Sequence, residues 1–184
     1  MKKVLFIVGS LRKESFNRQL AEKAEKLMAE KAEVAYLNYL DVPFMNQDVE
    51  FPAPESVKRA REEVINADAL WFFTPEHNYS YPGVLKNLLD WLSRPLTPGG
   101  AREKSAIAGK SAAISSAAGR SGGAGARTKL GELLKCIFVN PIECEQTGVA
   151  MSAETFRTGS LVLNPEQQAS LKAQAEALLK AAEE

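Results

Sequence analysis

Five short apolar runs divide the chain, and segments with helical spacing of apolar residues lie between them. The runs that we expect to be strands span residues 4–8, 34–37, 69–74, 111–116 and 138–144. The expected helices span residues 16–31, 57–66 and 82–92, then the segment after a glycine-rich turn (119–125) to about 136, and a last segment from Pro165. Strands that alternate with helices indicate βαβ units, and therefore a parallel sheet with helices on both faces. We expect a single α/β domain over residues 1–184 with the doubly wound strand order 2-1-3-4-5.

Composition disfavours several other classes of protein. Lys plus Arg and Asp plus Glu number 23 each, so the formal net charge is zero. Proteins that bind nucleic acid usually carry a basic excess, and electron carriers steered by their own field usually carry an acidic one. The chain has two cysteines, neither in a CxxC pair, and one histidine. A zinc site of the Cys/His type is therefore disfavoured, and we expect no metal.

No segment of the sequence predicts export or insertion into a membrane. The first apolar run ends at Val8, and the polar residues Ser10 and Arg12 follow, so the run is too short for a signal peptide. No later apolar run is long enough to cross a bilayer. We expect a cytoplasmic protein that has neither a membrane nor a nucleic acid as its partner.

The turn after the first expected strand carries groups that bind anions. Ser10, Ser15 and Asn17 offer neutral donors there, and Arg12 offers a guanidinium. The turn lies between a strand end and a helix N-terminus, where free backbone N–H groups and the helix dipole favour an anion. Because the turn does not match GxGxxG, a phosphomonoester fits it better than the pyrophosphate of a dinucleotide. Ser15 is in addition the expected N-cap of the helix.

The turn after the third expected strand is rigid and polar. Pro75 and Pro82 bracket a segment that contains Glu76, His77 and Asn78. A flat ring can lie against such a turn while its heteroatoms contact backbone N–H groups and the Asn78 amide. Glu76 has no partner in the sequence for acid–base work, so we expect no catalytic side chain.

The segment after the fourth expected strand, residues 115–125, is rich in glycine and serine. Small side chains would let its backbone approach a ligand closely. A flexible loop explains the same composition equally well, so glycine content alone does not decide between the two.

Two longer motifs resemble those of a known enzyme family. They read Gly9-Ser10-Leu11-Arg12-x-x-Ser15-Phe16-Asn17 and Pro75-Glu76-His77-Asn78-Tyr79-Ser80-x-Pro82-Gly83-x-Leu85-Lys86-Asn87-x-x-Asp90-Trp91. Together they resemble the NADPH-dependent FMN reductase family, above all its soluble bacterial quinone and chromate reductases and its azoreductases. The resemblance implies a flavodoxin-like three-layer sandwich, bound FMN, NADPH or NADH as co-substrate, and a homodimer or homotetramer.

The resemblance also implies where FMN lies. Residues that would hold its phosphate are Ser10, Arg12, Ser15, Phe16 and Asn17. Residues that would line its ring are Pro75, Glu76, His77 and Asn78, with Ser115, Ser116 and Gly119 closing the other side. The family usually has tyrosine at the position of His77, a change that backbone contacts should tolerate.

The resemblance predicts an FMN-dependent NAD(P)H oxidoreductase. Hydride from NAD(P)H would pass through the flavin to a small acceptor such as a quinone, an azo compound, a free flavin or a chromate-like oxyanion. Arg120, in the third loop, is a candidate contact for the additional phosphate of NADPH. One alternative is a flavodoxin-like electron carrier without NAD(P)H activity of its own, against which zero net charge and Arg12 argue. The other is a flavin-free binding module with the same fold.

Overall fold

The five expected strands form one parallel sheet in the computed structural model, which describes residues 1–183. Their order is β2-β1-β3-β4-β5, which confirms the predicted topology, and a further strand, β6, pairs with the end of β4. The strands are β1 (Lys2–Val8), β2 (Ala32–Tyr36), β3 (Ala69–Phe73), β4 (Ser111–Ala118), β5 (Asn140–Pro141) and β6 (Gly148–Ala150). Val8 pairs with Phe73, and Phe73 pairs with Ser115. The carboxyl ends of the three central strands therefore meet at one edge of the sheet.

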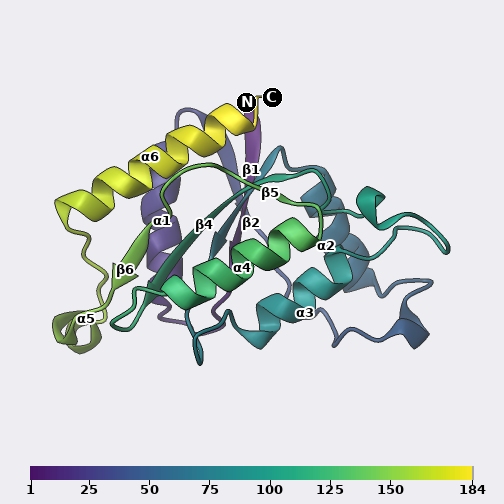
Figure 1. Cartoon of the computed structure of the whole chain (residues 1–184), viewed down its shortest axis with the longest axis horizontal. Helices are drawn as coiled ribbons and strands as arrows, with labels where there is room; N and C mark the ends of the chain where they lie inside the picture. The colour runs from purple at the N-terminus through teal and green to yellow at the C-terminus, as the bar shows by residue number, and fades with distance from the viewer. Residues whose placement is uncertain (184) are drawn as a thin grey trace.

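Helices cover both faces of the sheet, as predicted (Figure 1). On one face lie α1 (Phe16–Met28) and α6 (Pro165–Ala181), and on the other lie α2 (Glu55–Ile65), α3 (Gly83–Leu92) and α4 (Ala124–Cys136). A short helix, α5 (Ala153–Thr158), follows β6, and two single turns of 3-10 helix, η1 (Gln47–Val49) and η2 (Arg102–Lys104), interrupt the long loops. Within residues 1–183, none of these helices has the length and apolar character needed to span a membrane.

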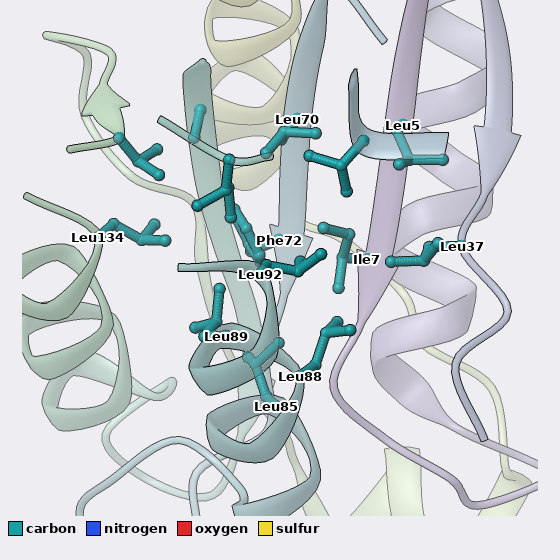
Figure 2. Close-up of a cluster of buried hydrophobic side chains, with 14 of the residues drawn as sticks. Leu5, Ile7, Leu37, Leu70, Phe72, Leu85, Leu88, Leu89, Leu92 and Leu134 are labelled. Atoms are coloured by element: carbon teal, nitrogen blue, oxygen red, sulfur yellow. The ribbon is translucent and has the colours of Figure 1, made fainter. Parts of the chain in front are cut away.

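The apolar runs of the sequence become two cores because successive side chains of a strand point to opposite faces. Leu70 and Phe72 of β3 belong to the core beneath α3 and α4, whereas Trp71 and Phe73 belong to the core beneath α1 and α6. Figure 2 shows the first core, in which the leucines of α3 gather below Ile7 and Phe72. Each fully buried side chain of this size contributes roughly 1.5–3 kcal/mol to folding, so the sheet is a stable support for the loops at its edge.

The C-terminal part of the sheet departs most from the sequence prediction. The fifth strand has two residues, Asn140–Pro141, so it lies within the expected range 138–144 but is much shorter than predicted. Phe138 adopts a left-handed backbone (φ 66°), which a strand residue does not have, and Pro141 has no N–H to extend the ladder. β4, by contrast, is longer than predicted: it ends at Ala118, beyond the expected end at 116. Both β6 and α5 lie where the sequence pattern predicts neither.

Candidate functional site

A cavity of about 650 Å³ opens at the sheet edge where β1, β3 and β4 end. This volume lies within the roughly 300–1,000 Å³ of most small-molecule sites. The lining residues are Gly9, Ser10, Leu11, Arg12, Ser15, Phe16, Asn17, Phe44, Pro75, His77, Pro82, Gly83, Val84, Ala117, Met151 and Phe156. The cavity lies beside the switch point between β1 and β3, where doubly wound folds bind their ligands.

The turn from Gly9 to Asn17 leaves backbone donors free beside the cavity. Among the residues that the structure describes, the N–H groups of residues 10–17 donate to no other protein atom. Ser15 caps α1 as expected, because its Oγ accepts the N–H of Arg18 at 3.2 Å. A side-chain carbon on Gly9 would make a tight contact of 3.3 Å with Pro82, so glycine there lets the two turns approach closely. Free N–H groups at a helix start form a ready site for a phosphate.

Asn17 holds two walls of the cavity together. Its buried side chain donates from Nδ2 to the Ala117 carbonyl at 2.9 Å, and its Oδ1 accepts the Ala117 N–H at 2.8 Å. The start of α1 is thereby fixed to the end of β4. One N–H donor and one acceptor position of the Asn17 amide are used in this link, so the side chain shapes the cavity as well as lining it.

Arg12 is the exposed cation at the mouth of the cavity. Its guanidinium carbon lies 5.1 Å from the centre of the Phe16 ring, within cation–π distance, and Phe16 in turn packs edge-on against Phe156 at 5.7 Å. Within residues 1–183, Arg12 takes part in no ion pair. Its charge is therefore available to an anion in the cavity.

The turn after β3 is fixed by its own backbone. His77 and Ser80 exchange two hydrogen bonds, 2.9 Å from the His77 N–H to the Ser80 carbonyl and 3.1 Å in the reverse sense. Asn78 (φ 51°) and Tyr79 (φ 60°) occupy the two central positions with left-handed backbone, which Asn tolerates well and Tyr rarely adopts. Pro75 and His77 line the cavity, and Asn78 does not. The turn thus presents a preset surface with no need for a ligand to order it.

Glu76 does not line the cavity and binds the start of α4. Its Oε1 accepts the Ser121 hydroxyl at 2.5 Å, and its Oε2 accepts the Ala126 N–H at 2.9 Å. Helix α4 has Gly123 at its N-cap and therefore no side-chain cap of its own. A side-chain carbon on Gly125 would lie 3.0 Å from Glu76 Oε2, so glycine there makes room for the carboxylate. The bond from Ser121, followed by those from backbone N–H groups, lowers the pKa of Glu76.

The structure does not bring Ser115, Ser116 or Gly119 to the cavity surface. Ser115 is fully buried, accepts from the Trp71 indole at 3.0 Å and donates to Gln174 Oε1 at 2.8 Å. Ser116 is also fully buried, and its hydroxyl bonds to the Gly122 carbonyl and to Arg127. Ala117, one residue further along β4, lines the cavity in their place.

Several lining residues were not anticipated from the sequence. Met151 follows β6 and Phe156 lies on α5, while Phe44 comes from the loop between β2 and α2. No motif marks these positions, because each lies in a segment without a strong periodic pattern. Within residues 1–183, no group of three His, Cys, Asp or Glu side chains is placed to hold a metal ion.

Comparison with known proteins places this chain in a family. Residues 2–154 match the family of NADPH-dependent FMN reductases. A quinone reductase of Pseudomonas putida is 38% identical over 155 residues, which are 83% of this chain and 80% of that protein. An NAD(P)H-dependent FMN reductase of Pseudomonas aeruginosa is 35% identical over 178 residues, 96% of this chain and 92% of the relative.

Comparison with solved structures shows that related enzymes have the same fold. FerB, a flavoenzyme NAD(P)H:(acceptor) oxidoreductase from Paracoccus denitrificans, superimposes with a TM-score of 0.85 and 31% identity over 100% of this chain and 98% of that one. The family match spans both motifs of the sequence and all lining residues except Phe156. The predictions of family, enzyme class and cofactors are confirmed. The chain belongs to the NADPH-dependent FMN reductase family and is an FMN-dependent oxidoreductase that uses NAD(P)H.

Proposed function

We propose that FMN binds in the cavity at the carboxyl ends of β1, β3 and β4, and that it carries electrons from NAD(P)H to quinones and similar small acceptors. One observation carries this proposal. A single cavity of about 650 Å³ joins the anion-binding turn 9–17 to the preset turn that begins at Pro75. Relatives named quinone reductase support quinones as the acceptor class.

The residues around the cavity fit FMN. The phosphate would lie against the free N–H groups of residues 10–17, the Ser10 hydroxyl and the Arg12 guanidinium. The ring would lie beside Pro75 and His77, with apolar side chains completing the enclosure. Both ends of the cofactor thus have partners of suitable chemistry in one continuous space.

The other predicted residues would support the site without lining it. Glu76 would hold the turn after β3 against α4, and Asn78 would set its backbone. Ser115 and Ser116 would brace the end of β4 from within the sheet. Gly119 would form the start of the loop that follows β4.

The hydride chemistry is that of the flavin, which accepts a hydride and passes electrons to an acceptor. The protein binds and orients FMN, NAD(P)H and the acceptor. The turn after β3 is already ordered by its two internal hydrogen bonds, so its backbone dipoles need no rearrangement when charge develops on the ring. Glu76 is ionised at neutral pH and committed to Ser121 and Ala126, so it holds no proton to give. No protein nucleophile is required.

We also propose that the chain forms a homodimer or homotetramer. Leu11, Leu40 and Phe44 are 55%, 69% and 87% exposed around the cavity mouth. Apolar side chains gathered beside a binding site are typical of a surface that a partner covers. Light scattering coupled to size-exclusion chromatography would give the number of subunits, and a monomer at micromolar concentration would contradict this proposal.

We propose a cytoplasmic location for the working enzyme. Cys136 and Cys144 are both free thiols, which suits a reducing compartment. Fractionation of cells that express the tagged chain would test the location, and recovery outside the cytoplasmic fraction would contradict it.

The test of the function uses purified protein reconstituted with FMN. NADPH or NADH consumption is followed with 1,4-benzoquinone, an azo dye, free FMN or chromate as acceptor, and without one. We expect bound FMN and steady consumption with the quinone that needs no second protein. Oxidation that occurs only when a separate reductase is added would instead identify an electron carrier, and absence of FMN binding would refute the proposed site.

A further inference from the structure

A second hollow, which we call the side pocket, adjoins the FMN cavity across the turn after β1. Its volume is about 470 Å³. It shares Ser10, Leu11 and Arg12 with the cavity, so the two spaces meet at this turn. The remaining wall of the side pocket comes from the start of α1 and from the segment that leaves β2.

The side pocket carries an excess of positive charge. Arg12, Lys13 and Arg18 line it, and no carboxylate among residues 1–183 does. Within the described part of the chain, Arg12 and Lys13 have no ion-pair partner. Arg18 lies 3.3 Å from Glu22, and both side chains are about half exposed, so this pair neutralises Arg18 only weakly. Because the FMN phosphate would engage Arg12, the FMN-loaded pocket offers Lys13 as an uncompensated cation and Arg18 as a weakly compensated one.

The cations surround a flat, aromatic wall. The Arg18 guanidinium stacks on the Tyr36 ring at 3.6 Å, which holds its plane in place. The Tyr36 hydroxyl donates to Glu25 at 2.7 Å, and the Tyr39 hydroxyl donates to the Val8 carbonyl at 2.7 Å. Because Tyr39 is 6% exposed and Arg18 covers a face of the Tyr36 ring, the wall offers mainly the outer face of the guanidinium plane to a ligand. This combination suits a phosphate carried on an aromatic nucleoside.

We propose that the side pocket binds the adenosine 2′-phosphate of NADPH and gives this enzyme a preference for NADPH over NADH. The inference rests on the proposed function, because the nicotinamide of the same molecule must reach FMN in the adjoining cavity. NADPH differs from NADH only by this phosphate dianion, so the positive charge of Lys13 and Arg18 favours NADPH over NADH. Arg120, the candidate from the sequence, lines neither the cavity nor the side pocket.

The first test measures binding without turnover. Calorimetry on FMN-loaded protein compares 2′,5′-ADP with 5′-AMP and with inorganic phosphate. We expect 2′,5′-ADP to bind at least tenfold tighter than either, and Lys13→Gln and Arg18→Gln each to lose most of that difference. Glu22→Gln removes the competing carboxylate and should strengthen the binding of 2′,5′-ADP. Equal affinities of the unaltered protein for 2′,5′-ADP and 5′-AMP would overturn the proposal.

The second test is the ratio of kcat/KM for NADPH to that for NADH. We expect this ratio to fall at least tenfold in the Lys13→Gln, Arg18→Gln double variant. The matched control is Lys23→Gln, Lys26→Gln, which removes two charges from the same helix outside the side pocket. An unchanged ratio in the double variant, with FMN still bound, would also overturn the proposal.

The two tests separate this inference from the function on which it rests. Calorimetry with 2′,5′-ADP can be repeated on protein without FMN. A chain that prefers 2′,5′-ADP yet fails to bind FMN would support the side pocket and refute the flavin site. A chain that binds FMN and oxidises NADH and NADPH equally well would retain the flavin site and refute the side pocket.

Discussion

Replacing Glu76 by alanine should destabilise the fold more than an exposed glutamate normally does. The carboxylate links the turn after β3 to α4 by bonds of 2.5 Å from Ser121 and 2.9 Å from the Ala126 N–H. Helix α4 depends on this carboxylate for capping because Gly123, at its N-cap, has no side chain. The substitution therefore removes a helix cap and a connection between two loops at the same time.

The expected loss follows from these contacts. Removing an N-capping side chain costs about 0.5–2 kcal/mol, and hydrogen bonds to a charged group contribute about 1.5–3 kcal/mol when shielded from water. Glu76 is partly exposed, so screening by solvent reduces the second contribution. We expect Glu76→Ala to lower the free energy of unfolding by about 2 kcal/mol and Glu76→Gln, which keeps one acceptor oxygen, by about 1 kcal/mol.

The effect should depend on pH in a defined direction. The Ser121 hydroxyl, then backbone N–H groups, hold the pKa of Glu76 below its ordinary value in the folded protein. A carboxyl whose pKa is lowered by folding contributes its full stability above its unfolded pKa and loses it as the pH falls through the folded value. The difference between wild type and Glu76→Ala should therefore be complete at pH 7 and shrink below about pH 4.3.

Urea denaturation of the flavin-free protein at several pH values measures this difference. Glu62→Ala is the control, because Glu62 is an exposed glutamate on α2 without an ion pair within residues 1–183, and its loss should change stability by less than about 0.5 kcal/mol. Coincident unfolding midpoints for Glu76→Ala and wild type at pH 7 would refute the capping role.

Three further substitutions test other parts of the site. Arg12→Ala should raise the Kd for FMN about 10- to 100-fold, measured by fluorescence quenching, and an unaltered Kd would remove Arg12 from the phosphate site. Asn17→Ala should lower unfolding free energy by about 2–4 kcal/mol, because it leaves the buried Ala117 N–H and carbonyl unpaired; a loss below about 0.5 kcal/mol in urea would contradict this. Gly123→Ala should cost about 2–3 kcal/mol in the same assay, since its φ is 81° and the new carbon would lie 2.5 Å from Ser116 Oγ; full stability would show that the turn can relax.

The order of the sheet could be predicted from the sequence because β3 is buried throughout and must be covered on both faces. The starts of helices were also readable from local chemistry. Ser15 caps α1, and the last helix begins at Pro165, as predicted. These features depend on residues close to one another in the chain.

The orientation of the serines at the end of β4 could not be predicted in this way. A strand that ended at 116 would have placed Ser115 and Ser116 at the loop, but β4 continues to Ala118 and draws both into the sheet. Ser115 is then held by Gln174, a residue of α6 far along the chain. Partners at such separations leave no local signal in a single sequence.

The lack of a local signal also explains why the sequence did not predict Met151 and Phe156 as cavity-lining residues. β6 has three residues and α5 has six, too few for a recognisable period. Tertiary bonds position them, such as the one from the Met151 N–H to the Ala118 carbonyl at 2.8 Å. The partner of Glu76 is likewise invisible in the sequence, since Ser121 and Ala126 lie in a segment whose glycines alone suggest only a loop.

The most direct measurement compares the binding of FMN and of riboflavin to the same flavin-free protein. The two ligands share the ring and differ by the phosphate that the turn 9–17 is proposed to hold. We expect FMN to bind about a hundredfold tighter or more, since charge-assisted contacts to a phosphate each contribute about 1.5–3 kcal/mol. Equal affinities for FMN and riboflavin would contradict the proposed phosphate site after β1.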